Sequence, residues 1–315
     1  MAKGPKGPDY LRPPPPQRTA PISGYPCRPL TAGVLLVAGC SPAGLHVSTV
    51  QADAPARHTA AVALPDAHSF TLTDKRENTQ HRIYVALPTG YGSSEDRYPV
   101  LFLLDAAPVF AHAAQLTRIL SFDSSIPGLL LVGIGYDPSA TDRVERRIRD
   151  LTPSKTATAT SSGGGQEFLA FLAETVVPLI DSAYRTNPQD RAITGHSLGG
   201  LFALYALFER PELFRRVVAT SPSLWWDDGF LFRLEQVFSR AHEALPKSVY
   251  LSVGTREPND MQEFFGPFVD SLGKRGYAGL NLTAETLPGE THLSALPTGL
   301  LRGLRSVYAS VPGKP

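Results

Sequence analysis

The segment 195–200, with the sequence GHSLGG, constrains the fold of this chain more than any other. It matches the pattern Gly-x-Ser-x-Gly, follows a strand-like run at 191–194 and precedes an apolar, helix-forming run at 201–208. In that context the serine lies on a tight turn from strand to helix, and the glycines leave room for close backbone packing around it. The pattern therefore predicts that Ser197 is a catalytic nucleophile. The alternative is an ordinary glycine-rich turn.

Strand-like and helix-like segments alternate through the rest of the chain. Two runs at 69–73 and 81–88 predict an antiparallel hairpin, and the continuous apolar runs at 98–105 and 129–136 are typical of strands buried on both faces. Further strands are expected at 191–195, 216–221, 247–253 and 280–287, and helices at 166–184, 198–209, 230–243, 260–275 and 298–309. This alternation predicts an α/β fold with a mainly parallel sheet and helices on both faces. Active sites in such folds lie at the carboxyl ends of the strands.

Two loops that follow predicted strands supply partners for Ser197. Glu257 follows the strand at 247–253, and His292 follows the strand at 280–287. The chain order of serine, acid and histidine is that of the α/β-hydrolase fold. In such a triad the histidine removes the serine proton, and the carboxylate fixes the imidazole tautomer and stabilises its cation. Asp260 is the alternative acid, and the structural alternative for His292 and Glu257 is an ordinary surface loop.

An oxyanion hole requires two hydrogen-bond donors. The backbone N–H of Leu198, directly after the nucleophile, is one of them. The loop that follows the strand at 98–105 is expected to supply the other, from Asp105 or Ala106. Asp105 could instead be purely structural.

Six motifs are spread over the part of the chain from about residue 68 to 309. They are Gly135-Tyr136, RRIRDLTP at 146–153, GGG at 163–165, the run 195–207, SPSLWW at 221–226 and GETH at 289–292. Together they resemble the esterase-D-type superfamily of α/β hydrolases. Within it they are most similar to the siderophore-hydrolysing branch, typified by enterobactin and salmochelin trilactone esterases. The resemblance implies hydrolysis of carboxylic esters without a metal or other cofactor, with Ser197 and His292 in the catalytic positions.

The chain departs from the pattern of this superfamily in one place. Relatives commonly have Asp-Gly-Asn where this chain has Asp105-Ala106-Ala107, and an alanine at 106 suits an oxyanion donor only if its φ is negative. In some relatives the acidic member of the triad is absent or dispensable. A dyad of Ser197 and His292 is therefore an alternative to the triad.

The charge of the chain bears on its ligand. A formal net charge of +1 argues against a nucleic-acid-binding protein, so charge-driven recognition must be local. A ferric catecholate siderophore is strongly anionic, and clustered arginines and tryptophans would suit its charge and its rings. The candidates for substrate binding are Arg146, Arg147 and Arg149, which follow a strand end, and Trp225 and Trp226. The alternative is that the arginines pair with neighbouring acids and the tryptophans belong to the core.

The N-terminal part of the sequence predicts that the protein is exported from the cytoplasm. Residues 1–29 are rich in Pro and Gly, which cannot build a core, and an apolar run at 30–39 ends at Cys40. This layout resembles a bacterial lipoprotein signal with the lipobox Val37-Ala38-Gly39-Cys40. Lipidated Cys40 would anchor a tether at 41–60 and a single α/β-hydrolase domain at 61–312. The alternative is a buried strand that ends in cysteine, and the protein is then cytoplasmic.

The sequence thus predicts a periplasmic or cell-envelope serine esterase that opens the trilactone backbone of a catecholate siderophore and so releases iron. One alternative is a general carboxylesterase for acyl, feruloyl or thioester substrates, and another is a catalytically silent binding protein of the same fold. The expected partner is a small-molecule ester. We expect no metal, cofactor or nucleic acid, and contact with a membrane only through the lipid anchor.

Overall fold

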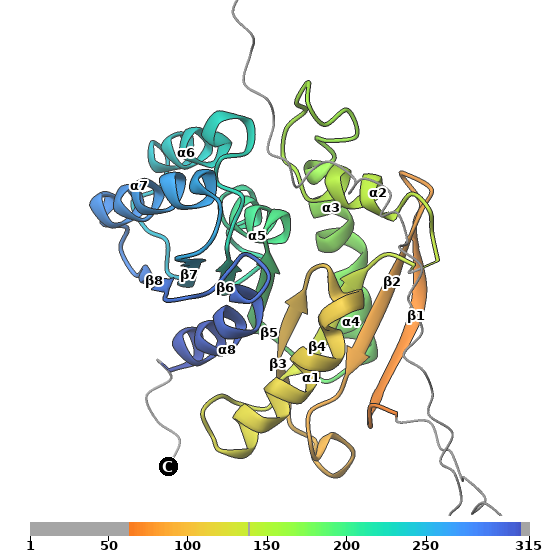
Figure 1. Cartoon of the computed structure of the whole chain (residues 1–315). Coiled ribbons are helices and arrows are strands. Elements are labelled where there is room, and N and C mark those ends of the chain that lie inside the picture. Colours follow the sequence, from red (N-terminus) through yellow and green to blue (C-terminus); the bar gives the residue numbers. More distant parts are fainter. Residues whose placement is uncertain (1–62, 138, 310–315) are drawn as a thin grey trace, which may run out of the picture. The chain divides into compact units, whose positions relative to one another are not determined.

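The computed structural model describes residues 63–137 and 139–309 (Figure 1). The predicted lipobox at 37–40, the lipidation of Cys40 and the tether at 41–60 lie outside these residues and stay predictions. Among the described residues, no helix is both long and apolar enough to span a bilayer.

Eight strands of the described part form one sheet in the order β1-β2-β4-β3-β5-β6-β7-β8. β2 is antiparallel to both β1 and β4, and every other neighbouring pair is parallel. The strands are β1 (Ala67–Asp74), β2 (Thr79–Ala86), β3 (Tyr98–Leu103), β4 (Leu130–Gly135), β5 (Thr186–His196), β6 (Arg216–Thr220), β7 (Ser248–Gly254) and β8 (Asn281–Leu287). The predicted opening hairpin and mainly parallel sheet are confirmed.

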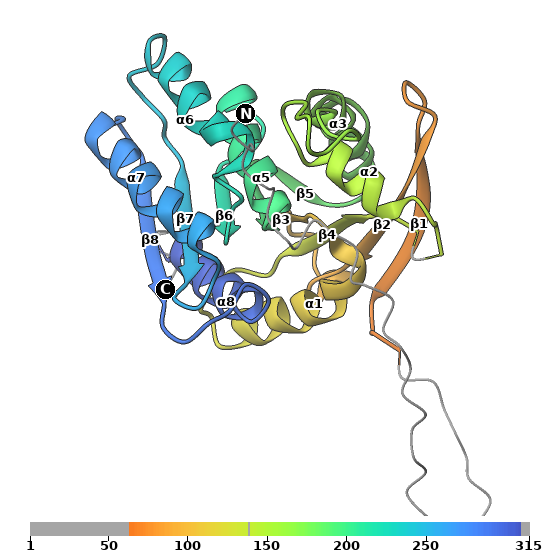
Figure 2. The same ribbon diagram turned by 45° about the horizontal axis from the view of Figure 1, so that its top comes forward.

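Helices cover both faces of this sheet (Figure 2). One face carries α1 (Ala106–Phe122) and α8 (Ala295–Tyr308). The other face carries α3 (Gly165–Phe171), the π-helical turn η3 (Leu172–Val176), α4 (Val177–Ala183), α5 (Leu198–Glu209), α6 (Trp226–Ser239) and α7 (Asn259–Arg275). The short elements η2 (Tyr91–Ser93) and α2 (Arg143–Asp150) complete the set. The α/β-hydrolase architecture expected from the sequence is confirmed.

The side chains of β3 show why the central strands are continuously apolar. Val100 and Phe102 pack into the core under α5, whereas Leu101 and Leu103 pack into the core under α1 and α8. All four are at most 4% exposed. Because successive residues of a strand point to opposite faces, a strand covered by helices on both sides must be apolar at every position.

Two helices are missing from the sequence-based prediction. α1 is rich in alanine and has Pro108 in its first turn, while α2 is mostly charged. Neither segment has the clear apolar stripe that reveals a surface helix in sequence. α6 is interrupted near its start by Asp227, Asp228 and Gly229, which adopt left-handed conformations, so its regular part begins at about residue 230 as predicted. It ends at Ser239, earlier than the predicted end at 243.

Two glycines let α8 lie close to the sheet. A Cβ atom on Gly303 would lie 2.4 Å from Cγ1 of Val218, and one on Gly299 would lie 2.5 Å from Cγ2 of Thr220. Both distances are well below van der Waals contact, so neither position can hold a larger residue without movement of α8. The placement of α8 matters because the loop that leads into it carries His292.

We expect Gly303→Ala to lower the free energy of unfolding by about 1–3 kcal/mol, the usual cost of overpacking a core. Gly273→Ala is the matched control, because Gly273 is exposed in α7 and a Cβ there has nothing within 4 Å. Alanine at that position should stabilise by about 0.5–1 kcal/mol through helix propensity. Urea denaturation of both variants checks this. A Gly303→Ala protein as stable as the wild type would show that α8 can shift at no cost.

Candidate active site

Ser197 occupies a strained turn between β5 and α5. Its backbone has φ 59° and ψ −121°, a conformation that is rare outside glycine. Its N–H donates to the Thr220 carbonyl at 3.1 Å, and its own carbonyl accepts from the N–H of Ser223 at 3.2 Å. A Cβ on Gly195 would lie 2.2 Å from the Gly199 carbonyl oxygen, so this turn requires glycine there. The turn therefore has the geometry of a nucleophile elbow.

Glu257 and His292 come together at the carboxyl ends of β7 and β8. Nδ1 of His292 lies 2.8 Å from Oε2 of Glu257, and the Glu257 side chain is fully buried. Its second oxygen, Oε1, accepts from the Ser221 hydroxyl at 2.5 Å and from the Gly254 N–H at 2.6 Å. These bonds fix the carboxylate, which in turn orients the imidazole.

Asp260, the alternative acid, lies in the first turn of α7. Its Oδ1 accepts a hydrogen bond from the backbone N–H of Met261 at 2.9 Å. The hydrogen bond from Nδ1 of His292 to the buried Glu257 carboxylate favours Glu257 as the acid of the site.

A second histidine, His196, packs against His292. The two ring centroids are 4.5 Å apart and the rings are inclined by 43°. Burial, together with the nearby His292 and Arg147, lowers the pKa of His196 to about 3, and the Thr220 backbone offsets only part of that shift. His196 is therefore uncharged at neutral pH. The sequence analysis did not single it out, although it directly precedes the nucleophile.

The expected oxyanion donors lie at the starts of two helices. Leu198 is the first residue of α5, and Ala106 is the first residue of α1. In the loop before α1, Asp105 has the left-handed conformation, with φ 53°. Ala106 is not among the described residues with positive φ. The condition that the sequence analysis placed on Ala106 is thus met. Asp105 Oδ2 lies 3.4 Å from a Cβ placed on Gly199, so the α1 loop adjoins the α5 turn.

Arg147 binds Asp105 through a bidentate ion pair. Its Nε lies 2.8 and 2.9 Å from the two carboxylate oxygens, and its terminal nitrogen lies 2.7 Å from Oδ2. Two parallel bonds of this kind fix both groups in one orientation. Arg147 therefore connects α2 to the loop that carries the expected second oxyanion donor.

The other residues predicted to bind substrate have partners within the protein, as in the alternative given from the sequence. Arg146 pairs with Asp142 at 2.7 Å and Arg149 pairs with Glu77 at 2.7 Å. Trp226 is 1% exposed and its Nε1 donates to Ser154, so it belongs to the core and cannot stack on a substrate. Trp225 is half-buried and its Nε1 donates to the Met261 sulfur at 3.1 Å. Neither tryptophan lines the cavity beside the site.

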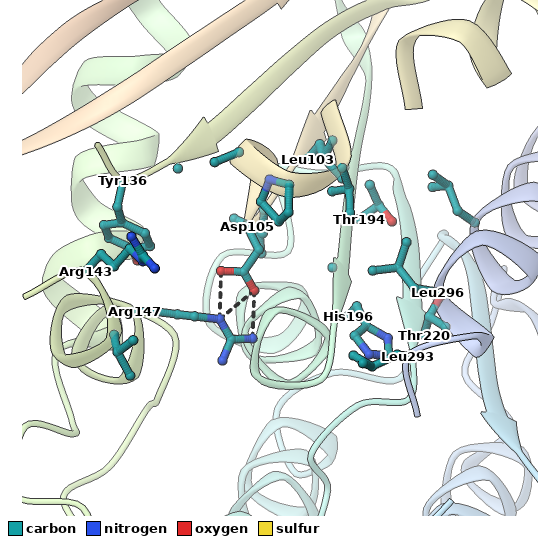
Figure 3. A pocket seen from close by; sticks show the side chains of 18 residues that line it. Leu103, Asp105, Tyr136, Arg143, Arg147, Thr194, His196, Thr220, Leu293 and Leu296 are labelled. Atoms are coloured by element: carbon teal, nitrogen blue, oxygen red, sulfur yellow. Dashed lines mark hydrogen bonds and ion pairs between the residues drawn. The ribbon is translucent and has the colours of Figure 1, made fainter. Parts of the chain in front are cut away.

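A cavity of about 610 Å³ opens beside the Ser197 turn (Figure 3). In Figure 3, Asp105 and Arg147 lie on one side of it, and His196 and Leu296 lie on the other. Its wall is formed by the ends of β3, β4, β5 and β6, the first turns of α1 and α8, and α2. Most of the lining is apolar: Leu103, Leu104, Ala107, Pro108, Val109, Val144, Leu293, Leu296 and Leu300. The cavity is large enough to hold a sizeable part of a small-molecule ester.

Within residues 63–137 and 139–309 there is no group of three or more His, Cys, Asp or Glu side chains that could hold a metal ion. The arrangement of Ser197, His292 and Glu257 supports transfer of an acyl group to a serine hydroxyl.

Comparison with known proteins agrees with this geometry. The model of the Esterase family matches residues 75–271. The chain belongs to the Esterase family. It is 31% identical over 284 residues to the siderophore triacetylfusarinine C esterase of Aspergillus fumigatus, covering 80% of this chain and 96% of that protein. It is 27% identical over 263 residues to the ferri-bacillibactin esterase BesA of Bacillus subtilis, covering 78% and 90%.

Solved structures place the fold in the same group. Siderophore hydrolase EstB of Aspergillus nidulans superposes with a TM-score of 0.70 and is 28% identical, covering 82% of this chain and 100% of that one. The predicted resemblance to the siderophore-esterase branch is confirmed, and this esterase acts on carboxylic esters.

The sequence analysis did not single out Ser221 or His196, and it gave Arg147 a substrate or a neighbouring acid as its partner, without naming Asp105. Ser221 holds the Glu257 carboxylate, Arg147 holds Asp105, and His196 lies beside His292. Ser221 lies within the SPSLWW motif and Arg147 within RRIRDLTP, so the motifs marked the segments without revealing the partners. The partners are 36 and 42 residues away in sequence, where no local pattern reports contact.

We expect Glu257→Gln to lower kcat on the order of a hundredfold, because an amide cannot stabilise an imidazolium as a carboxylate does. Asp260→Asn is the matched comparison and should lower kcat much less. Steady-state hydrolysis of p-nitrophenyl acetate measures both variants. A larger loss in Asp260→Asn would identify Asp260 as the acid.

Arg147→Gln should lower kcat by about tenfold for neutral and anionic esters alike, because the α1 loop loses its ion pair and the oxyanion donor its position. The loss should not depend on salt. Arg210→Gln, which removes an exposed pair with Glu212 at the far end of α5, is the control. If Arg147→Gln instead raises only the KM of an anionic ester, and more at low salt, Arg147 binds substrate charge directly.

Proposed function

We propose that this esterase hydrolyses ester bonds of a siderophore, with Ser197 as nucleophile, His292 as base and Glu257 as the supporting acid. The observation that carries the catalytic part is the hydrogen bond from Nδ1 of His292 to the buried Glu257 carboxylate, at the same sheet edge as the strained Ser197 turn. The substrate part rests on the relatives, since a siderophore triacetylfusarinine C esterase and a ferri-bacillibactin esterase each match most of this chain.

In the proposed first step, the Ser197 hydroxyl oxygen attacks the ester carbonyl carbon while its proton passes to Nε2 of His292. The tetrahedral oxyanion accepts hydrogen bonds from the N–H of Leu198 and from the N–H of Asp105 or Ala106. The C–O bond to the alcohol then breaks, and His292 returns the proton to the departing alkoxide. The products of this step are the alcohol and an acyl-Ser197 ester.

In the second step, water attacks the acyl-Ser197 carbonyl and gives its proton to His292. The oxyanion is held by the same donors, and its collapse breaks the bond to Ser197 Oγ, which takes the proton back. The carboxylic acid leaves and the serine is restored. In both steps Glu257 stabilises the imidazolium that His292 becomes, which is why its burial and its three hydrogen bonds matter.

The finer proposal is a catecholate trilactone of the enterobactin or salmochelin type. Its electrostatic support is reduced, since Arg146, Arg147 and Arg149 each have a carboxylate partner. Recognition of such a ligand would then depend on shape and on hydrogen bonds more than on net positive charge. The envelope location proposed from the segment 37–40 would suit release of iron from an imported siderophore.

A general carboxylesterase is the second candidate, because one observation favours it. The cavity beside Ser197 is lined mainly by leucine, valine, alanine and proline side chains, which suit the apolar chain of a simple ester. Competition experiments separate the two candidates. Ferric and iron-free enterobactin and triacetylfusarinine C are compared with p-nitrophenyl and feruloyl esters. A kcat/KM at least about a hundredfold higher for one siderophore supports the first proposal, and a preference for simple esters supports the second.

We expect Ser197→Ala to lower the rate of hydrolysis of every ester by several orders of magnitude, because the variant loses its nucleophile. The thermal unfolding midpoint should stay near that of the wild type, as the change removes only one oxygen. A fluorophosphonate probe should label the wild type and not the variant. The matched control is Ser223→Ala, whose hydroxyl lies 3.5 Å from that of Ser197 and which should still be labelled. Labelling of Ser197→Ala would rule out the assignment.

A further inference from the structure

The outward face of α1 is unusual for a surface helix because it carries almost no charge. Arg118 is the only Lys, Arg, Asp or Glu among the 17 residues of α1. α1 lies along the outside of the sheet (Figure 2). Its exposed residues are Ala107, Pro108, Ala111, His112, Gln115, Ile119 and Phe122. Surface helices normally present charged side chains to water, so this face suits contact with a less polar surface.

The end of α1 is the most apolar part of this face. Phe122 is 93% exposed and Ile119 is 63% exposed, and their spacing of three residues puts both on one side of the helix. Three other large apolar side chains are exposed in the described part of the chain. Val144 and Leu293 line the cavity beside Ser197, and Val237 stands alone on α6. Among the described residues, Ile119 and Phe122 are thus the exposed apolar pair away from the catalytic site.

The described chain begins beside this pair. Arg118 donates a hydrogen bond to the Pro65 carbonyl, and Leu64 packs against the core under α1. The N-terminal part of the chain therefore joins the fold next to the end of α1. The predicted lipid anchor, Cys40, belongs to that part, and the segment from Cys40 to Leu64 spans at most about 80 Å when extended.

This end of α1 lies at the sheet edge opposite the catalytic residues. α1 follows the carboxyl end of β3 and leads back to the amino end of β4, which is parallel to β3. β1 starts at the same edge, because Ala67 pairs with Ala86, which in turn pairs with Leu131 near the start of β4. The catalytic residues follow the carboxyl ends of β5, β7 and β8. A surface that binds Phe122 therefore leaves the catalytic edge open.

The size of the pair favours a lipid surface over a protein partner. Two side chains offer no more than a few hundred Å² of apolar contact, whereas a stable protein interface needs about 800 Å² from each partner. A bilayer has no such minimum for a chain that is already tethered to it, because the tether keeps the contact at a high effective concentration.

The chemistry of this end of α1 also fits a lipid surface. Phenylalanine and isoleucine suit the boundary between headgroups and acyl chains, and Arg118 suits anionic headgroups. The carboxylate of Asp123, which follows Phe122, is close enough to Arg305 of α8 for their charges to interact. Its negative charge is thus offset within the protein.

We propose that the end of α1 rests on the membrane to which lipidated Cys40 attaches the chain, with Ile119 and Phe122 inserted among the lipid headgroups. The catalytic edge then faces the aqueous compartment, where a soluble ester reaches Ser197 freely. The proposal uses the lipid anchor predicted from residues 37–40 and is independent of the proposed substrate.

The test places the chain on vesicles whether or not a cell lipidates it. A Cys27→Ser chain retains one thiol, at Cys40, which is coupled to a maleimide lipid in vesicles of phosphatidylethanolamine and phosphatidylglycerol. Phe122→Trp in this chain reports contact at the end of α1. Val144→Trp is the matched control, because Val144 is also apolar and exposed on a helix but lies at the catalytic edge. Emission from the two native tryptophans is subtracted.

We expect the Phe122→Trp emission to move to shorter wavelength on the vesicles and to be quenched when brominated lipid is included, because the indole leaves water for the headgroup region. The Val144→Trp emission should be the same with and without vesicles. Phe122→Ser should keep the wild-type kcat/KM for p-nitrophenyl acetate, since Phe122 lies at the edge opposite the site.

A Phe122→Trp emission that does not respond to vesicles would overturn the proposal, and a response of Val144→Trp in its place would show the opposite orientation. Sedimentation velocity of the uncoupled chain tests a second copy as the partner, because a dimer that Phe122→Ser abolishes would make this face a dimer interface. Recovery of the wild-type chain from bacterial cytosol with Cys40 unmodified would exclude the membrane. Hydrolysis of a siderophore, or its absence, changes none of these outcomes.

Discussion

The backbone conformation of Ser197 is the constraint on which the rest of the site depends. A non-glycine residue at φ 59° and ψ −121° costs on the order of 1–3 kcal/mol, so it persists only where the surroundings enforce it. The elements on both sides of the turn hold Ser197 in this conformation. β5 is held between β3 and β6 in the middle of the sheet, and residues 198–208 of α5 are all buried. The hydrophobic core thus stabilises the strain that projects one hydroxyl from the sheet edge.

The central strand, turn and helix could be predicted from sequence because every signal in them is local. A short β-rich run, glycines at fixed spacing and an apolar helix lie within about twenty residues of one another. The order of Ser197, Glu257 and His292 also followed from the rule that loops at the carboxyl edge of a parallel sheet meet. What could not be predicted depends on contacts between distant segments. The ion pair of Arg147 with Asp105 joins residues far apart in the chain, and no local sequence pattern indicates their contact. The sequence made Trp226 a candidate for substrate binding, but its side chain is buried in the core.

Charge has a different role here from the one that composition indicates. The arginines of α2 look in sequence like a basic patch for an anionic ligand, but each of those predicted to bind substrate has a carboxylate within ion-pair distance. Arg147 in particular joins a surface helix to the α1 loop. Positive charge in this segment therefore holds the rim of the site in place, and the cavity beside the Ser197 turn presents a mainly apolar wall to a ligand.

The order of the strands along the chain has a consequence for folding during synthesis. β8 is the last strand in the described part of the chain and lies at one edge of the sheet, and His292 follows it. During synthesis from the N-terminus, β3 to β6 can pair and α5 can pack while the ribosome still holds the C-terminal segment. The bond between Glu257 and His292 can form only after nearly the whole chain has emerged. In a nascent chain, β3 to β6 and α5 can therefore be folded, with Ser197 already in its strained turn, before His292 has been brought into place.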